Sequence, residues 1–408
     1  MYLFCPFYPH DSPKSINKTL SVVFKKAMTK KRPRHALWRK MCLCFKIPRM
    51  TTKEKILEMM GKGEFVSGEL MAQECGISRA AVHKAIESLR NAGYFIDAVK
   101  NKGYMISHMP DDVSGEEIGR IAQSLGCTIP PVMAHDTIDS TNTEAKRLCA
   151  EAGSFRNADG SLTEGGNKLN RQLIVSGEQT AGRGRMGREF VSKANSGIYF
   201  SLIHSPKNGV TNPAMLTAAA AVAVSRALDE IYGTNCRIKW VNDILLEVGN
   251  GKFKKVCGIL TEGIANFETG TVEAAIIGIG INVRKGEFPG ALGEIAGSVE
   301  DILGDGAKKT VSRNEIVART AANLLSLYDA MENNGSDAKK AMMESYKEKS
   351  MLIGRTVTVN PAAGMAGETY GAKVIGISDE AELVVEAENG GTKCLHSGEV
   401  SIRSSSFS

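Results

Sequence analysis

The stretch GEQTAGRGRMGREF, residues 177–190, follows a predicted strand and carries three glycines at the spacing GxGxxG. A dinucleotide-binding turn with this spacing opens a helix and is followed about 20 residues later by an acidic side chain. Here the next residues, FVSKANSGIYF, contain Asn, Ser and Gly before strand formers, and positions 204–209 hold no acid. The loop also lacks the GK[ST] ending of a P-loop. The sequence therefore argues against both nucleotide-binding folds.

Three arginines, Arg183, Arg185 and Arg188, stand between and beside the glycines of this loop. Glycine lets a backbone approach a ligand closely, and the arginine guanidinium donates paired hydrogen bonds to carboxylates and phosphates. We therefore expect an anionic ligand that orders the loop. The alternative is a basic loop that only faces water.

A further cation lies in the predicted strand KKVCGILTE, residues 254–262. Strict alternation assigns Lys255 to the same face as Cys257 and Ile259, away from Gly258. A lysine among apolar side chains costs free energy unless an anion pairs with it. We expect such an anion near Lys255; the alternative is a lysine at a strand edge that faces water.

The segment DTIDSTNTEAKRL, residues 136–148, places Ser140, Thr141 and Asn142 at the start of a predicted helix. One interpretation is N-capping, in which a hydroxyl accepts from the amides of the first turn. The other is that this end of the helix also binds a polar group of a ligand. Both interpretations remain open at this point.

Two further motifs are weaker on their own. The segment RIKWVNDILLE, residues 237–247, puts Lys239, Asn242 and Asp243 at a strand–turn–strand junction, where Asn-Asp is ordinary turn chemistry. The segment GIGINV, residues 278–283, ends a buried strand with two glycines, so that a backbone or a ligand is expected to pass close to it.

Residues 50–107 are predicted to form three helices followed by two strands. Ser67 and Ser78 stand at helix-capping positions, Gly76 lies in the turn between the second and third helices, and NKG predicts a hairpin turn. This order predicts a winged helix-turn-helix. The exposed N-terminal half of the third helix carries the candidate DNA-binding residues Ser78, Arg79, His83 and Lys84. The alternative is a packing module with an ordinary basic face.

The rest of the chain divides into two further domains. Residues 113–350 alternate strands with helices and predict a mixed α/β domain, interrupted at 153–171 by a Gly/Asn-rich stretch that we interpret as a surface loop insertion. Residues 351–404 hold short strands between turn residues, which predicts a small β-barrel or sandwich. The expected fold class is therefore a multidomain α/β (α+β) protein.

The positive charge of the chain is concentrated at its start. Residues 1–49 carry 12 Lys/Arg and one acid, whereas the remainder has a net charge of −5. A signal peptide is disfavoured because the apolar core LSVVF is short; a transit peptide is possible, but we expect a basic extension that is disordered or not part of the working protein. Nine scattered cysteines without metal-type spacing favour a reducing, cytoplasmic compartment, and no apolar run is long enough for a membrane span.

In chain order, DSTN, QxAGRGRxGR, KWxND, KxxGILxE and GIGINV resemble the motifs of the biotin protein ligases. The predicted winged helix resembles the DNA-binding domain of the bifunctional ligase–repressor members of that family. The C-terminal strands ending in SGEVSIR resemble the family's small SH3-like domain. The resemblance covers about 50–404 except the 153–171 insertion, and it implies a winged helix-turn-helix at 50–107, a mixed-sheet ligase domain at 113–350 and an SH3-like β-barrel at 351–404.

The resemblance implies a two-step ligase reaction. Biotin and ATP, with Mg²⁺, would form biotinyl-5′-AMP, and biotin would then pass to a lysine of a biotin carboxyl carrier protein. The same protein would act as a ligand-dependent homodimer that represses biotin genes at an operator, with biotinyl-AMP as corepressor. Two alternatives stay open: a lipoate- or octanoate-type acyl ligase, and a non-catalytic ligand-sensing regulator. The arginine loop and the DNA-binding domain oppose the first, and Lys255 together with the loop arginines opposes the second.

The resemblance also implies the roles of individual residues. The catalytic residues would be Lys255, Arg183 and Arg185. The biotin-binding residues would be Ser140, Thr141, Asn142, Gln179, Arg183, Gly184, Arg185 and Lys255. The residues that bind ATP or the adenylate would be Gly182, Gly187, Arg188, Lys239, Asn242, Asp243 and Asn282. No motif for direct metal binding is present, so Mg²⁺ would arrive with ATP.

Overall fold

The computed structural model describes residues 51–60, 64–91, 94–108, 111–266, 268–286, 288–304, 311–360, 369–387, 390–396 and 399–402. The basic extension 1–49 lies outside these ranges. The chain divides into two compact units, one formed by residues up to 89 together with 97–105 and the other by the remainder. Each unit is described by itself. In the described ranges, no helix combines the length and apolar character that a membrane crossing requires.

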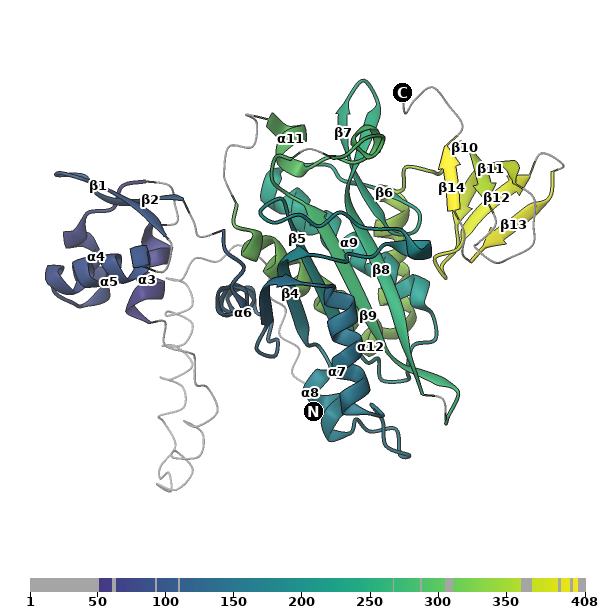
Figure 1. The fold of residues 1–408 in the computed structure, drawn as a ribbon, viewed down its shortest axis with the longest axis horizontal. Helices are drawn as coiled ribbons and strands as arrows, with labels where there is room; N and C mark the ends of the chain where they lie inside the picture. The colour runs from purple at the N-terminus through teal and green to yellow at the C-terminus, as the bar shows by residue number, and fades with distance from the viewer. Residues whose placement is uncertain are drawn as a thin grey trace, which may run out of the picture. The chain divides into compact units, whose positions relative to one another are not determined.

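The N-terminal elements form a winged helix-turn-helix, as predicted (Figure 1). Their order is α3 (Thr52–Met60), α4 (Gly68–Cys75), α5 (Arg79–Asn91), β1 (Phe95–Val99) and β2 (Gly103–His108). The side chain of Ser67 caps α4 by accepting from the Leu70 amide, and Gly76 ends α4 in the left-handed conformation with φ 67°. Ser78 accepts from the Ala81 amide at 3.2 Å, which starts α5 at the expected position.

The hydrophobic core of this unit comes from the inward faces of its three helices. Ile56, Met71 and Ile86 are fully buried. Gly103 closes the wing: its φ is +106°, and a Cβ there would lie 2.1 Å from the carbonyl oxygen of Val66. The four candidate DNA-binding side chains are all exposed: Ser78, Arg79, His83 and Lys84.

In the described part of the second unit, seven strands form one mixed sheet in the order β3-β4-β5-β9-β8-β7-β6. The strands are β3 (Met133–Ile138), β4 (Leu173–Gln179), β5 (Gly197–His204), β6 (Arg237–Lys239), β7 (Asp243–Gly249), β8 (Lys252–Asn266) and β9 (Thr271–Asn282). The pair β3–β4 is parallel, and each other neighbouring pair is antiparallel. The central strand β5 is buried along its whole length, as expected for a sheet covered on both faces.

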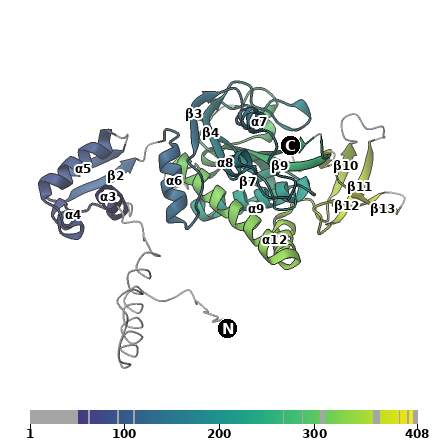
Figure 2. The same cartoon turned by 90° about the horizontal axis from the view of Figure 1, so that it is seen from below.

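Helices cover both faces of this sheet (Figure 2). On one side lie α9 (Pro213–Tyr232) and the long α12 (Arg313–Lys349), with α6 (Gly115–Ser124) beside α12. The alanine-rich stretch of α9 lets its backbone approach the sheet closely, and residues 218–224 are completely buried. On the other side lies α7 (Thr141–Ala152).

The segment 153–171 is only partly the surface loop that its composition predicted. It contains a short helix, α8 (Glu164–Leu169), and its apolar side chains Phe155 and Leu169 are buried in a small core with residues of α7, β4 and β9. The buried carboxylate of Glu273 on β9 accepts from the Phe155 amide at 2.7 Å. The prediction was partly wrong because two apolar anchors determine the packing, and a glycine such as Gly166 serves close approach, since a Cβ there would lie 2.4 Å from the Phe155 carbonyl oxygen.

The C-terminal strands form an antiparallel sheet in the order β13-β12-β11-β10-β14. They are β10 (Thr356–Asn360), β11 (Tyr370–Ile377), β12 (Leu383–Ala387), β13 (Thr392–Leu395) and β14 (Glu399–Ile402). In the described residues this sheet is open rather than a closed barrel, because β14 pairs with β10, at the opposite edge from β13. Trp240 donates its indole N–H to the Ala381 carbonyl at 2.9 Å and so joins this sheet to the β6–β7 turn.

We predict that Phe155→Ala lowers the free energy of unfolding of this unit by about 3–5 kcal/mol, the usual cost of emptying an aromatic site in a packed core. Urea denaturation followed by circular dichroism would measure it. The matched control is Lys168→Ala in the same segment, whose exposed side chain should change the free energy by less than about 0.5 kcal/mol. Equal small effects for both variants would mean that the segment is a surface loop after all.

Candidate active site

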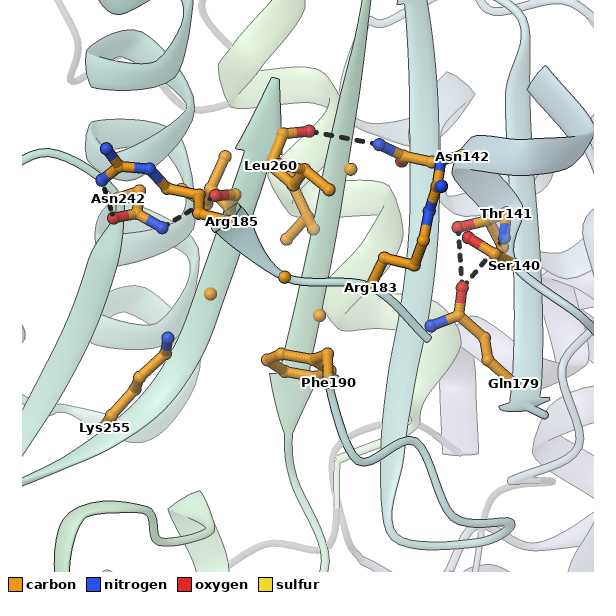
Figure 3. Close-up of a pocket in the computed structure, with 16 residues that line it drawn as sticks. Ser140, Thr141, Asn142, Gln179, Arg183, Arg185, Phe190, Asn242, Lys255 and Leu260 are labelled. Atoms are coloured by element: carbon orange, nitrogen blue, oxygen red, sulfur yellow. Dashed lines mark hydrogen bonds between the residues drawn. The ribbon is translucent and has the colours of Figure 1, made fainter. Parts of the chain in front are cut away.

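A pocket opens where the start of α7, the arginine loop and the middle of β8 and β9 meet (Figure 3). It is lined by Ser140, Thr141, Asn142, Gln179, Arg183, Gly184, Arg185, Phe190, Asn242, Lys255, Gly258, Ile259, Leu260, Gly278, Ile279 and Gly280. Neutral polar groups gather at one end, around Thr141 and Gln179, where Arg183 also lies; Arg185 and Lys255 lie at the other end, with Phe190 between them. The pocket therefore suits a ligand with a neutral polar head, an apolar body and an anionic end.

The polar end is built on the first turn of α7. Ser140, Thr141 and Asn142 are all buried. Gln179 accepts from the Thr141 amide at 2.9 Å, and its own amide group donates to Ser192 at 2.9 Å. Among the described residues, no first-turn amide donates to the Ser140 side chain, so simple capping by that hydroxyl is excluded. A hydroxyl in this position is available to a ligand.

Asn142 is fixed by contacts on both sides of its amide. Its Nδ2 donates to Glu262 at 2.8 Å and to the Leu260 carbonyl at 3.3 Å, and its Oδ1 lies 2.6 Å from the Ser201 hydroxyl. The side chain fits because Gly278 is opposite: a Cβ at that position would lie 2.1 Å from Oδ1. The glycine pair of the GIGINV motif is therefore needed for close approach, as its sequence suggested.

The arginine loop is folded back on itself as a tight turn. The Gly184 amide donates to the Arg188 carbonyl at 2.7 Å, and the Phe190 amide donates to the Gly182 carbonyl at 2.9 Å. Met186 at the apex has φ 56°, in the left-handed region, and is exposed. A Cβ at Gly182 would lie 2.4 Å from the Phe190 carbonyl oxygen, so this glycine is required by the turn itself.

Phe190 lies over a gap in the side-chain layer of the sheet. Gly258 on β8 and Gly280 on β9 are paired neighbours. A Cβ at Gly280 would be 2.5 Å from the phenyl ring, and one at Gly258 would be 3.0 Å from it. The two missing side chains therefore let the ring lie flat against the strands and form the apolar wall of the pocket.

Lys255 lies on the other face of β8 from the one that alternation predicted. A β-bulge interrupts the pairing with β7, so that Leu245 opposes Lys255 while Ile244 opposes Cys257, and Val256 is the extra residue. The bulge turns the lysine to the Gly258 side, where a Cβ of that glycine would meet its Nζ at 3.1 Å. The expected anion is also present, because Lys255 forms an ion pair of 2.7 Å with Asp243.

A second compartment continues from the cationic end of the first. It is lined by Gly184, Arg185, Arg188, Glu189, Phe190, Val191, Asn242, Asp243, Lys255, Asn282, Phe288, Leu292, Ile295 and Ala296. Arg185 bridges the two compartments by donating to Asn242 at 3.0 Å, and Asn242 donates in turn to the Ile259 carbonyl at 3.0 Å. One wall is apolar and another carries cations, which suits a flat ring with attached phosphates.

Most of the site residues suggested by the sequence come together here, but three do not line either compartment in the described structure: Gly182, Gly187 and Lys239. Gly182 is required by the turn of the loop but faces neither compartment. Gly187, with φ +73°, supports its apex. Lys239 ends β6 and pairs in register with Asp243, so it lies next to the pocket rather than in its wall.

Sequence reasoning missed the polar residues that hold the site residues in place, above all Glu262. Burial by itself would raise the pKa of this carboxyl, but hydrogen bonds from Lys146 and Asn142 and the charge of Arg183 hold it below its ordinary value. The signal was present in KKVCGILTE, where an acid follows Gly258 and Leu260 at steps of two. Ser192 and Ser201 had no such signal, because they contact the site through partners distant in sequence.

The site gathers cations, and the cysteine of β8, Cys257, does not line it. Cys257 is completely buried behind the sheet, and burial raises its pKa far above the ordinary range of a thiol. Within the described ranges, no three His, Cys, Asp or Glu side chains are grouped so as to hold a metal ion. This arrangement can stabilise negative charge on two substrates, and the buried Cys257 thiol is not placed for covalent catalysis.

We predict that Gly278→Ala lowers the free energy of unfolding by about 1–3 kcal/mol, since the new methyl group overlaps Asn142 and forces a shift in a packed region. Chemical denaturation would measure it. The control is Gly119→Ala in α6, where no atom lies within 4 Å of the added Cβ. That change should stabilise the protein by about 0.5–1 kcal/mol, because alanine is the better helix former. A neutral Gly278 variant would show that Asn142 is loosely held.

Comparison with known proteins agrees with this geometry. Residues 162–282 match the model of the "Biotin/lipoate A/B protein ligase family", and residues 52–105 match an HTH domain. The match begins inside the 153–171 segment. The bifunctional ligase/repressor BirA of Bacillus subtilis is 34% identical over 87% of this chain and 99% of its own length. The corresponding protein of Salmonella typhimurium is 27% identical over 86% of this chain and 97% of its own length.

A solved structure gives the same relationship. The biotin protein ligase from Aquifex aeolicus in complex with biotin and ATP is 26% identical, covers 67% of this chain and 99% of its own, and superimposes with a TM-score of 0.51. The relatives match over almost their full length, and they agree with the motif order, the fold and the pocket chemistry of this chain. The chain belongs to the biotin/lipoate A/B protein ligase family, among its bifunctional ligase/repressor members with an N-terminal helix-turn-helix.

Proposed function

We propose that this protein is an ATP-dependent biotin protein ligase that also represses transcription. It activates biotin to biotinyl-5′-AMP and transfers biotin to a lysine of a biotin carboxyl carrier protein. The observation that carries the proposal is the pocket itself: neutral polar groups at one end, an apolar wall at Phe190, and cations from the loop and from β8 at the other end. Biotin has the matching order of ureido head, apolar rings and chain, and carboxylate.

The cationic end answers the main physical difficulty of the first step. A carboxylate attacks an α-phosphate, so two anions approach each other and negative charge builds up in the transition state. Arg185 and Lys255 lie at that end and are oriented by Asn242 and Asp243 before a substrate arrives. Arg183 lies beside Asn142, within 3.6 Å of Glu262, and extends over the pocket from the polar end. Cations that are already oriented need little reorganisation when the charge develops, which lowers the barrier.

We assign the residues of the two compartments accordingly. Ser140, Thr141, Asn142 and Gln179 bind the ureido end of biotin, and Lys255 bridges the biotin carboxylate and the α-phosphate. The second compartment takes ATP, with Arg188, Asn242, Asp243 and Asn282 near its ribose and phosphates. The shape of the loop depends on its glycines, Gly182, Gly184 and Gly187. Lys239, which pairs in register with Asp243, contributes its positive charge from beside the ATP compartment.

Mg²⁺ fits this site as a companion of ATP. It is usually held by substrate phosphates, waters and one or two carboxylates rather than by a full protein cage. The second compartment offers two acids, Asp243 and Glu189. Bound there, Mg²⁺ would offset the charge of the leaving pyrophosphate.

The second step needs no nucleophile from this chain, because the attacking group is a lysine of the carrier protein. The adenylate is a mixed anhydride that water would hydrolyse, so the folded-over loop has a second task, which is to exclude water until the carrier lysine enters. ATP, the carrier and DNA are all found inside the cell, and we place the protein in the cytoplasm.

Lys255→Ala should slow adenylate formation by roughly 10²-fold or more, the scale for losing one preorganised charge contact. The measurement is biotin-dependent exchange of pyrophosphate into ATP. The matched control is Lys252→Ala, which removes an equal charge from an exposed position on the same strand and should leave the rate unchanged. Near-normal exchange in the Lys255 variant would remove this residue from catalysis.

The same assay separates the alternatives. Exchange that depends on lipoate or octanoate instead of biotin would make the protein a different acyl ligase. Biotin binding without any exchange would make it a sensor that lacks catalysis.

We assign DNA binding to α5 and propose that biotinyl-AMP strengthens both dimerisation and operator binding. Ser78, Arg79, His83 and Lys84 stand exposed at the start of this helix, the usual position for contacts to bases and phosphates. One such domain contacts few phosphates and binds weakly, whereas two domains fixed in a dimer gain affinity through effective concentration. A two-fold symmetric operator upstream of biotin genes follows from that symmetry.

Arg79→Ala should weaken operator binding and lower the slope of log affinity against log salt by about one, as for one lost phosphate contact. Fluorescence anisotropy with labelled operator DNA, with and without biotinyl-AMP, would measure both quantities. Lys53→Ala on α3 removes another exposed charge of the same domain and serves as the control. Equal affinity with and without the adenylate would refute the ligand-dependent switch but leave the ligase assignment intact.

A further inference from the structure

Glu262 on β8 has no assigned role in the reaction, yet its carboxylate joins three separate segments around the pocket. It accepts from Asn142 Nδ2 at 2.8 Å and from Lys146 Nζ at 2.6 Å. The guanidinium of Arg183 lies 3.6 Å from the same carboxylate. Helix α7, strand β8 and the arginine loop are therefore tied together at one partly buried acid.

The first consequence concerns the rotation of α7 against the sheet. Asn142 and Lys146 are four residues apart, so their side chains lie one turn apart on the same face of the helix. A carboxylate that accepts from both fixes that face toward β8. The first turn of α7, which carries the polar end of the pocket, is fixed with it.

The second consequence concerns the amide of Asn142. Its Nδ2 faces Glu262, and this leaves Oδ1 toward the Ser201 hydroxyl at 2.6 Å. The reverse orientation would put the amide oxygen against a carboxylate, where neither atom can donate. Glu262 makes the shorter of the two contacts that orient this amide, the other being the Leu260 carbonyl at 3.3 Å, and so helps to determine which donor and which acceptor Asn142 presents around the pocket.

The third consequence concerns Arg183. Its distance of 3.6 Å from Glu262 is longer than the 2.6 Å contact of Lys146, and about half of the Arg183 side chain is exposed. Such a contact is a weak ion pair in high dielectric. It holds the arginine above the pocket in the absence of ligand and yields to a ligand anion that binds the guanidinium more closely.

We propose that Glu262 is a positioning residue for biotin: it orients the Asn142 amide and holds Arg183 over the pocket before the ligand binds. This inference rests on the proposed ligase function. It does not make Glu262 a catalytic residue, since the carboxylate is not expected to touch the reacting atoms. Its effect belongs to biotin binding and to the order of the loop, and the KM for ATP should not depend on it.

The variant that tests the inference is Glu262→Gln. Asn142 and Lys146 donate to different oxygens of the carboxylate. A glutamine replaces one of these oxygens with a donor NH₂ group and carries no charge, so one of the two donors loses its acceptor and Arg183 is no longer attracted. In biotin-dependent pyrophosphate exchange, the KM for biotin should rise by roughly 10- to 100-fold, the range for losing a charge-assisted hydrogen bond. The kcat and the KM for ATP should change little. Trypsin should cleave the arginine loop of the ligand-free variant faster than that of the wild type.

Glu273→Gln provides a matched control. Glu273 is also a buried acid of the same sheet, and it accepts from the Phe155 amide at 2.7 Å and from Asn266 at 2.9 Å. Both changes should lower the melting temperature, whereas only Glu262→Gln should raise the KM for biotin. A similar rise in both variants, or an unchanged KM in the Glu262 variant, would overturn the inference.

The outcomes also separate this inference from the proposed function. A wild-type protein without biotin-dependent exchange would refute the function itself, and the inference with it. An active wild type with an unchanged Glu262→Gln variant refutes the inference alone. If Glu262→Gln does not fold, Lys146→Met removes the shortest contact of the carboxylate. It should raise the KM for biotin by a smaller factor of about 3–10, as for a weaker polar contact. An unchanged KM in that variant would count against the inference.

Discussion

The site depends on one constraint: the side-chain layer of the sheet must be missing where β8 and β9 run beside α7. Gly258 faces Gly280 across the two strands, and Leu260 faces Gly278. These three glycines leave a shallow floor in which the Phe190 ring and the Asn142 amide lie. A methyl group at Gly278 would collide with Asn142, and one at Gly280 would collide with Phe190. The pocket therefore requires glycine at these positions.

The charged end follows from a second irregularity in the same strand. Without the bulge at Val256, Lys255 would face the apolar core with Cys257, where an unpaired ammonium is very costly. The bulge brings it to the pocket side and next to Asp243. Arg183 and Arg185 come from a loop, yet each has a partner on the sheet, Glu262 and Asn242. Arg185 and Lys255 are thus oriented by the turn before β7 and by β7 itself, which is rigid support for a reaction between two anions, whereas the contact of Arg183 with β8 is looser.

Much of this was predictable from local signals. Ser67, Gly76 and Ser78 marked the helix boundaries of the winged helix because caps and left-handed turns act within four residues. The order of the five motifs along the chain was enough to predict which residues line the main pocket. Three things were not predictable, because each is settled by partners distant in sequence. The predicted face of Lys255 was wrong because a bulge shifts the strand period. Ser140 makes no capping hydrogen bond, and the amide of the next residue, Thr141, donates to Gln179, which is distant in sequence. The 153–171 segment is anchored because Phe155 and Leu169 find a core on α7 and β9.

The same preorganisation limits how the loop can signal. A ligand shifts an equilibrium only as far as its affinities for the two states differ, and arginines that already have protein partners offer less difference than free ones. Arg183 and Arg185 are engaged before any ligand arrives, so their ordering contributes to affinity by lowering the entropy lost on binding. The apex of the loop differs from these two arginines, because Met186 there is exposed and lies in the left-handed region at φ 56°. It is the part of the loop that we expect a ligand to reorder. In the proposed arrangement an adenylate would occupy both compartments, whereas biotin alone would occupy only the first. A loop with paired arginines and an exposed apex would then respond to the adenylate rather than to biotin alone.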